Sequence, residues 1–198
     1  MGIGLGACAL LPSGVEAQDK PGRFEGALVL EPRDKENRDF IVKQPFAYID
    51  KSGQKWDVPA GTITDGASVP RAFWSLFPPI GGRHLRAAVV HDRFCVVRNR
   101  DWRAVHLMFY EALLAGDVDE VSAKTMYMAV YAFGPRWVVG GGSREVQLPD
   151  VAQEDQEAAL RILRTWIENN DPNVRQMDAH MNSRQIRETG ARFISSDD

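Results

Sequence analysis

The spacing of apolar and polar residues divides the chain into a strand-like N-terminal part and a helical remainder. Alternation within "RFEGALVLEP" predicts a strand over about residues 24–30. The runs "FAYID" and "QKWDVPAGTIT" are separated by the turn signal "KSG", which predicts a hairpin over residues 44–64. Together these segments predict a small, largely antiparallel β-sheet.

Beyond residue 64 the apolar spacing becomes helical. Ser68 is placed as an N-cap for a short helix that Pro79 must terminate. Apolar stripes predict three further helices, over about residues 84–97, 101–115 and 118–133. Gly116 is expected to close the second of these, and Asp119 to cap the third.

The order of these elements predicts an α+β fold, in which the small antiparallel sheet packs against a three- to four-helix cluster. We assign this domain to residues 23–139 and expect a glycine linker to begin at residue 140. Residues 140–198 then form a helical C-terminal appendage, since residues 151–167 carry an apolar stripe. The appendage is expected to pack against the domain or to dock a protein partner.

Residues 1–22 are interpreted as an export signal or a disordered tail. The segment begins with a short apolar stretch, and Val15-Glu16-Ala17 has the small-x-small pattern that signal peptidase cuts. "LGAC" resembles a bacterial lipobox, which makes Cys8 a candidate lipid anchor. A periplasmic or secreted location is expected, with a cytoplasmic protein as the alternative. No apolar run is long enough for a transmembrane helix.

Charge and cysteine content narrow the function classes. The 198 residues carry a formal net charge of −3, so no nucleic-acid partner is expected. Only two cysteines are present, which excludes a disulfide framework. Cys95 follows His91 by four residues, so a Cys-His nucleophilic pair is one interpretation. A buried structural cysteine is the interpretation that we favour.

The stretch "AAVVHDRFC" places His91 and Asp92 next to each other in an otherwise apolar helix. Successive helical residues project about 100° apart, so Asp92 lies on or beside the apolar face and His91 lies round from it. Asp65, in the "TDGAS" turn, and His106, on the next helix beside several aromatic residues, are further candidates. A short connection between antiparallel helices would bring the two histidines close.

These four residues suit two kinds of site. Either histidine fits the role of general base, with a carboxylate that orients it. Asp92 and Asp65 are also candidate ligands of a divalent cation such as calcium. The spacing is not a recognised zinc pattern, because the chain has no HExxH and no paired CxxC.

Several motifs together resemble an uncharacterised domain family of tailed phages, prophages and bacteria. They are "FAYID", "VPAGTITDGASVPRAFW", "FPPIGG", "AAVVHD" and "MYMAVYAFGPRW", in this order over about residues 40–138. The resemblance implies a phage-related origin and brings no established activity. Many members have an aspartate three residues before a phenylalanine, where this chain has His106 before Phe109. A role that needs a carboxylate there is not carried over.

A fainter resemblance is to secreted phospholipases A2, in which a "DGxSxP"-like segment precedes a helix bearing His-Asp. It implies that His91 activates water and that Asp92 helps to bind calcium. The cysteine framework and the usual calcium loop of those enzymes are absent here.

Two hypotheses follow. In the first, the chain is an envelope or phage-derived hydrolase of ester or phospholipid-like bonds, with catalytic roles for His91, Asp92, His106 and Asp65. In the second, it is a non-enzymatic accessory protein in which His91 and Asp92 belong to a buried hydrogen-bonded network. A single open pocket holding all four residues would favour the first hypothesis.

Overall fold

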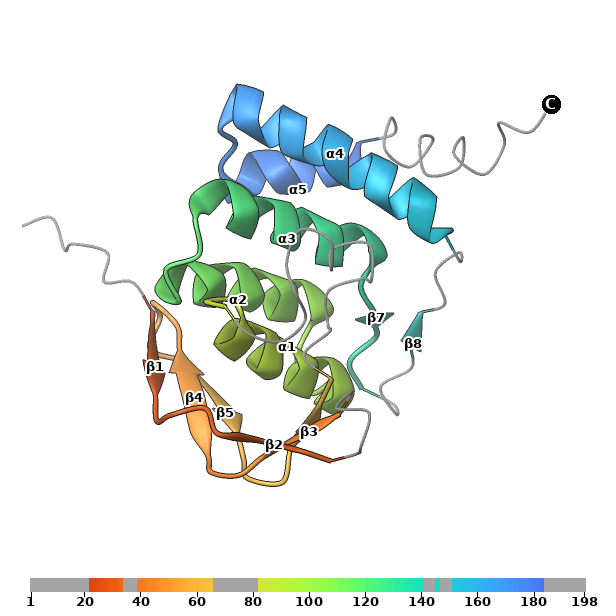
Figure 1. Ribbon diagram of the computed structural model, residues 1–198. Coiled ribbons are helices and arrows are strands. Elements are labelled where there is room, and N and C mark those ends of the chain that lie inside the picture. The colour runs from red at the N-terminus through yellow and green to blue at the C-terminus, as the bar shows by residue number, and fades with distance from the viewer. Residues whose placement is uncertain (1–21, 34–38, 66–81, 141–144, 147–150, 184–198) are drawn as a thin grey trace, which may run out of the picture.

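A computed structural model describes residues 22–33, 39–65, 82–140, 145–146 and 151–183. The predicted α+β class is confirmed. Two small antiparallel sheets lie at one side of the molecule, and the helices α1 (Leu85–Val97), α2 (Trp102–Ala115) and α3 (Glu120–Phe133) stack in turn above them (Figure 1). The short helix predicted from Ser68 onward lies outside the described residues.

Six short strands make the two sheets. Their bounds are Arg23–Glu25 (β1), Leu30–Pro32 (β2), Phe40–Val42 (β3), Phe46–Ile49 (β4), Lys55–Val58 (β5) and Ile63–Thr64 (β6). The first sheet has the order β1-β4-β5 and the second the order β2-β3-β6, and all pairs are antiparallel. The strand predicted over residues 24–30 is therefore divided between two sheets.

The hairpin between β4 and β5 is confirmed, with Phe46 opposite Val58. Its turn is held by Asp50, whose carboxylate accepts hydrogen bonds from the backbone N–H groups of Ser52 and Gln54. The chain then leaves this sheet at Gly61, whose φ of 84° is readily adopted by glycine. After this turn β6 pairs with β3 in the second sheet, so two sheets are present where one was predicted.

The three predicted central helices are confirmed within a few residues. Asp101 and Asp119 are N-caps whose side chains accept hydrogen bonds from backbone N–H groups of the first turn. Gly116 ends α2, as predicted. Because α1 contacts strands of both sheets on one side and α2 on the other, it buries seven residues around most of its circumference.

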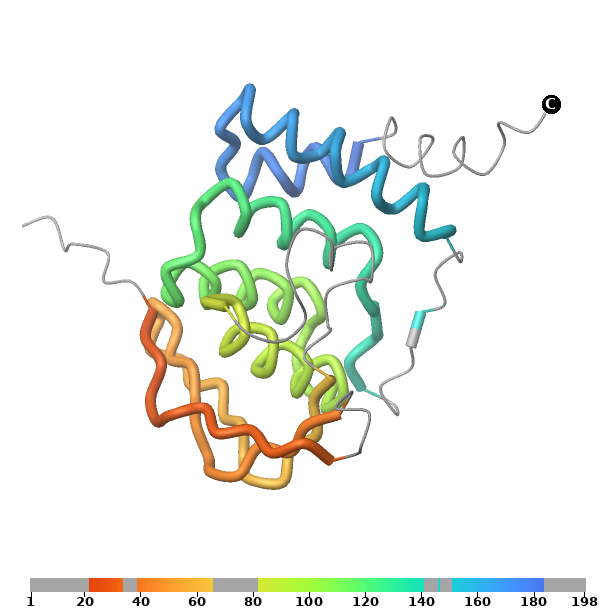
Figure 2. The backbone as a smooth tube through the Cα atoms, in the orientation of Figure 1, coloured from red at the N-terminus to blue at the C-terminus, as the bar shows by residue number. Residues whose placement is uncertain are grey.

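The C-terminal appendage packs against its own domain. Its helices α4 (Gln153–Asn170) and α5 (Val174–Asn182) both contact α3, and Figure 2 shows the backbone returning along it. Lys124 on α3 forms an ion pair with Asp171 at 2.6 Å, and the Tyr127 hydroxyl donates to the Asp178 carboxylate at 2.6 Å. The appendage therefore packs against the domain, and docking of a protein partner stays a prediction.

A short pair of strands follows α3, in a segment for which the sequence predicts only a loop leading to the glycine linker. β7 (Arg136–Trp137) pairs with β8 (Glu145–Val146). Trp137 is only 2% exposed, and its Nε1 donates a hydrogen bond to the backbone carbonyl of Arg100 at 2.7 Å. This strand places the indole next to α2, where it contacts His106.

One apolar core joins the sheets to the helices. It includes Val42, Phe46, Tyr48, Trp56 and Val58 from the strands, and Val89, Val90, Phe109, Leu113, Met126 and Val130 from the helices. No helix among the described residues has both the length and the apolar character needed to cross a membrane.

Candidate functional site

Helix α1 presents His91 and Asp92 to different neighbours. Asp92 accepts a hydrogen bond from the hydroxyl of Thr64 on β6, so this carboxylate is held by the second sheet. His91 contacts α2 instead, where its Nε2 lies 2.8 Å from Nδ1 of His106. The two adjacent polar residues therefore connect one helix to two different elements, which agrees with the angular offset predicted for them.

The two histidines form a hydrogen-bonded pair inside the protein. Both side chains are 0% exposed. Phe109 stacks on the His91 ring with centroids 4.6 Å apart, and Trp102 and Trp137 each make an edge-to-face contact with the His106 ring. Residues from α2 and β7 thus surround the pair with aromatic carbon.

Burial sets the charge of the pair. The pKa of His91 is lowered well below its ordinary value, first by burial and then by His106. The pKa of His106 falls to about 3, through burial and the positive charge of Arg136, while a backbone interaction with Pro135 opposes the fall. Both rings are therefore neutral at pH 7, so one ring nitrogen donates and the other accepts.

Cys95 lies one helical turn beyond His91, and its sulfur is 3.6 Å from Nε2 of that ring. The residue is partly buried. Burial raises the pKa of its thiol well above the ordinary range, Asp92 raises it further, and Arg98 acts in the opposite direction. The group is a thiol rather than a thiolate at neutral pH, so the expectation against a cysteine nucleophile is consistent with its surroundings.

Asp65 has a different environment from the other three candidates. It is exposed and directly follows Thr64, the residue that bonds Asp92. The remainder of the "TDGAS" turn, from residue 66, lies outside the described residues. The structure thus joins His91 to His106, attaches Asp92 to the strand that precedes Asp65, and leaves the Asp65 side chain exposed.

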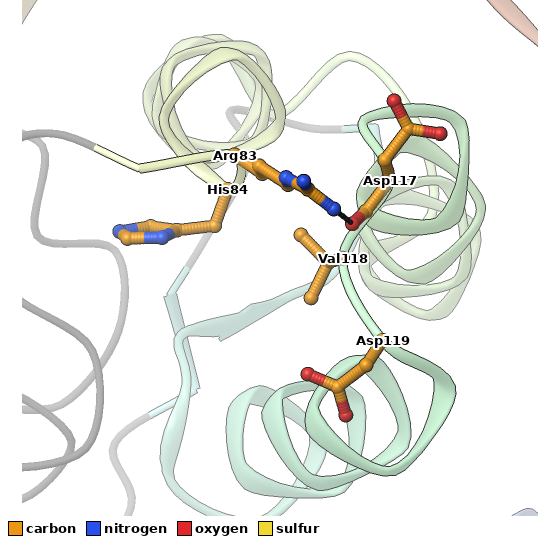
Figure 3. A pocket seen from close by; sticks show the side chains of 5 residues that line it. All are labelled: Arg83, His84, Asp117, Val118 and Asp119. Atoms are coloured by element: carbon orange, nitrogen blue, oxygen red, sulfur yellow. Dashed lines mark hydrogen bonds between the residues drawn. The ribbon is translucent and has the colours of Figure 1, made fainter.

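A surface pocket of about 420 Å³ lies at the start of α1 (Figure 3). It is lined by Arg83, His84, Asp117, Val118 and Asp119. Arg83 crosses it and donates a hydrogen bond to the backbone carbonyl of Asp117 at 2.9 Å. Its lining includes none of the four predicted site residues, so we do not treat it as their site.

Two residues of this region, Thr64 and Trp137, are not predicted from the sequence. Thr64 and Trp137 contact site residues only because β6 and β7 fold back onto the helices. Cys95, a candidate nucleophile in the sequence, is the third member of a cluster with both histidines. The sequence does indicate that His91 and Cys95 are neighbours, because a spacing of four residues places them on one helix face.

The fold and the site define an α+β domain with a buried, hydrogen-bonded histidine pair between α1 and α2. Residues 40–130 match the family DUF1353, which is described as a protein of unknown function. The resemblance to an uncharacterised domain family that the motifs predict is thereby confirmed.

Two relatives come from Sinorhizobium fredii (strain NBRC 101917 / NGR234). One, uncharacterized protein y4jT, is 38% identical over 141 residues, which is 68% of this chain and 42% of y4jT. The other, uncharacterized protein y4iH, is 32% identical over 151 residues, which is 65% of this chain and 62% of y4iH. The chain therefore spans less than two thirds of either relative. No solved structure matches it.

Proposed function

We propose that the chain is a non-enzymatic accessory protein organised around a buried polar network. The observation that carries this proposal is that His91 and His106 are both 0% exposed and hydrogen-bonded to one another. A catalytic base must reach a substrate proton directly or through one water molecule. A buried, mutually bonded pair instead fixes how helices pack.

The network holds α1 on two sides. The His91–His106 bond connects it to α2, and the Asp92–Thr64 bond connects it to β6. Apolar packing alone tolerates several arrangements of similar free energy, whereas a polar pair leaves unmet hydrogen bonds in any arrangement but one. We assign the network the task of setting the position of α1 between the sheets and the helices.

Replacing His91 tests this proposal. His91→Ala is expected to lower the free energy of unfolding by about 2–3 kcal/mol, because it leaves His106 Nδ1 without its partner and opens a cavity. Urea unfolding followed by circular dichroism measures the change. His180→Ala is the matched control, since His180 is only partly buried on α5, and it should cost less than about 1 kcal/mol. An unchanged stability for His91→Ala would contradict the network.

A hydrolase of ester or phospholipid-like bonds is the second candidate. It is favoured by the neutral state of the His91 ring, which a general base requires. Two carboxylates also lie nearby in the fold: Asp92 is on α1, and Asp65 directly follows Thr64, the residue that bonds Asp92. In this mechanism His106 would act as the second base, and the two carboxylates would position His91 or hold a cation.

An activity screen separates the two candidates. Wild-type protein and Asp65→Asn are compared on ester, phospholipid and peptidoglycan substrates, with and without added calcium. Asp65 is exposed, so its substitution should leave the fold intact. Turnover by the wild type that falls at least tenfold in Asp65→Asn would establish the hydrolase and overturn the accessory proposal. Absence of turnover supports the accessory protein.

The proposal also includes a location in the cell envelope and a phage-related origin, both of which are expected from the sequence. The lipobox-like "LGAC" and the sequence resemblance support them. Expression of the chain with Cys8→Ser tests the lipid anchor. The wild-type chain is expected in the membrane fraction and the variant in the soluble periplasmic fraction. Equal cytoplasmic recovery of both proteins would overturn this part of the proposal.

A further inference from the structure

We infer that His91, Cys95 and His106 form a three-donor site for a soft transition-metal ion of the Zn²⁺ or Cu⁺ class. One donor atom from each residue lies within 4.8 Å of the others. The inference goes beyond the proposed network, because the same two rings would hold an ion where they now hold a proton between them.

Two of the three donor–donor distances are close to those of a coordinated ion, and the third, between Cys95 and His106, lies within 4.8 Å. Tetrahedral zinc, with bonds of about 2.3 Å to sulfur and about 2.0 Å to nitrogen, places sulfur about 3.6 Å from nitrogen and two nitrogens about 3.3 Å apart. The sulfur of Cys95 is already 3.6 Å from Nε2 of His91. The nitrogens of the two rings are 2.8 Å apart, so they need to separate by only about half an ångström.

The donor atoms select the class of ion. Two imidazole nitrogens and a sulfur suit zinc and copper, whereas calcium takes oxygen ligands. The oxygen donors proposed from the sequence, on Asp92 and Asp65, are not members of this cluster. Any calcium site on those carboxylates would therefore be a separate one.

The surroundings also suit an ion of low net charge. Phe109, Trp102 and Trp137 place aromatic rings about the two histidines. A thiolate and Cu⁺ sum to zero charge, which reduces the cost of burial compared with an unpaired ion. Zn²⁺ would retain one positive charge and take a fourth ligand, so the two ions make different demands on the same donors.

The protons have defined destinations. Coordination removes the thiol proton of Cys95 to solvent. The proton now shared by Nε2 of His91 and Nδ1 of His106 moves to whichever outer ring nitrogen lacks one. Nε2 of His106 is buried and makes no hydrogen bond with a described residue, while the backbone of Pro135 interacts with that ring. A metal-bound histidine usually donates its outer N–H to a carbonyl, and in this structure Nε2 of His106 makes no such bond with a described residue.

Metal titration of the full chain tests the inference. Cys8→Ser serves as the background, because Cys8 is the only other cysteine. Zn²⁺ and Cu⁺ are each titrated in competition with a chromophoric chelator, and Co²⁺ is added as a spectroscopic substitute for zinc. We expect one ion per chain, a thiolate-to-cobalt absorption band, and a raised melting temperature with the bound ion.

Cys95→Ser in the same background is the decisive variant. It preserves the size of the side chain and leaves the histidine pair intact, and it should weaken binding at least about 100-fold and abolish the cobalt band. His180→Gln is the control for surface histidines and should bind as the background does. Circular dichroism confirms that each variant is folded.

Two outcomes would overturn the inference. One is that the background protein binds neither Zn²⁺ nor Cu⁺, and the other is that a folded Cys95→Ser variant binds as tightly as the background. Slower alkylation of Cys95 in the presence of the ion gives a further readout that needs no substitution. Neither overturning result affects the stability loss expected for His91→Ala, so the two proposals fail separately.

Discussion

Lowering the pH of the metal-free protein from 7 to 5 should remove about 4 kcal/mol of stability through His91 and His106 alone. Each histidine has a pKa below its unfolded value in the folded protein. Below about pH 6.5 the unfolded chain binds protons at these histidines and the folded protein does not. The free energy of unfolding therefore declines as the pH falls, by about 1.4 kcal/mol per pH unit for each ring. For His106 the decline continues toward its folded pKa of about 3. A domain of ordinary stability would unfold near pH 4–5.

The window above pH 4.5 isolates the histidines from the carboxylates. Asp50 and Asp119 also have lowered pKa values in the folded protein, through their hydrogen bonds, although burial opposes the effect. Their contribution is present above the unfolded pKa near 3.9 and is lost only below it. Acid-induced loss of stability between pH 6.5 and 4.5 is therefore assigned mainly to the two buried rings.

Urea unfolding at half-unit pH steps measures this slope. The double variant His91→Gln/His106→Asn should be less stable at pH 7 and should lose far less stability on acidification, so its curve approaches that of the wild type as the pH falls. His180→Gln should follow the wild-type curve closely, because the pKa of His180 is lowered only by partial burial. A wild-type slope that persists in the double variant would show that other groups cause it.

Local sequence signals were sufficient for the helices and for the hairpin. Asp101 and Asp119 cap their helices through short-range hydrogen bonds, and Asp50 closes its turn in the same way. Such contacts depend on neighbours in the sequence, so their spacing can be read directly. The division into two sheets depends instead on where β6 and β2 find partners across the chain, which no local pattern specifies.

The candidate site was predictable to a similar degree. The proximity of His91 and His106 follows from two adjacent helices with a short connection. Their complete burial could not be read from the sequence, because Trp137 reaches the pair from a strand that sequence reasoning treated as the way to a linker. The bond between Asp92 and Thr64 depends on β6 in the same way. Contacts between distant segments decided the environment of each predicted residue.

Trp137→Ala is expected to cost about 3–5 kcal/mol, the range typical of removing a buried aromatic side chain. The indole is only 2% exposed and its Nε1 bonds the Arg100 carbonyl, so the substitution leaves both a cavity and a partly buried acceptor without this donor. The ring centroid lies 6.3 Å from that of His106, and its loss also admits water toward the pair. The pKa of His106 should consequently rise from about 3 toward its ordinary value.

Two measurements check the roles of Trp137 together. Urea unfolding at pH 7 gives the loss of stability, and repetition at pH 5 should show a smaller acid effect than in the wild type, because a hydrated His106 accepts a proton while folded. Trp137→Phe keeps an aromatic ring and removes only the Nε1 donor, so it should cost about 1 kcal/mol. Trp166→Ala is the matched control on α4, where the indole is partly exposed and stacks on His180. Trp137 does not shield the histidine pair from water if Trp137→Ala lowers the free energy of unfolding no more than Trp166→Ala does and leaves the loss of stability between pH 7 and 5 unchanged.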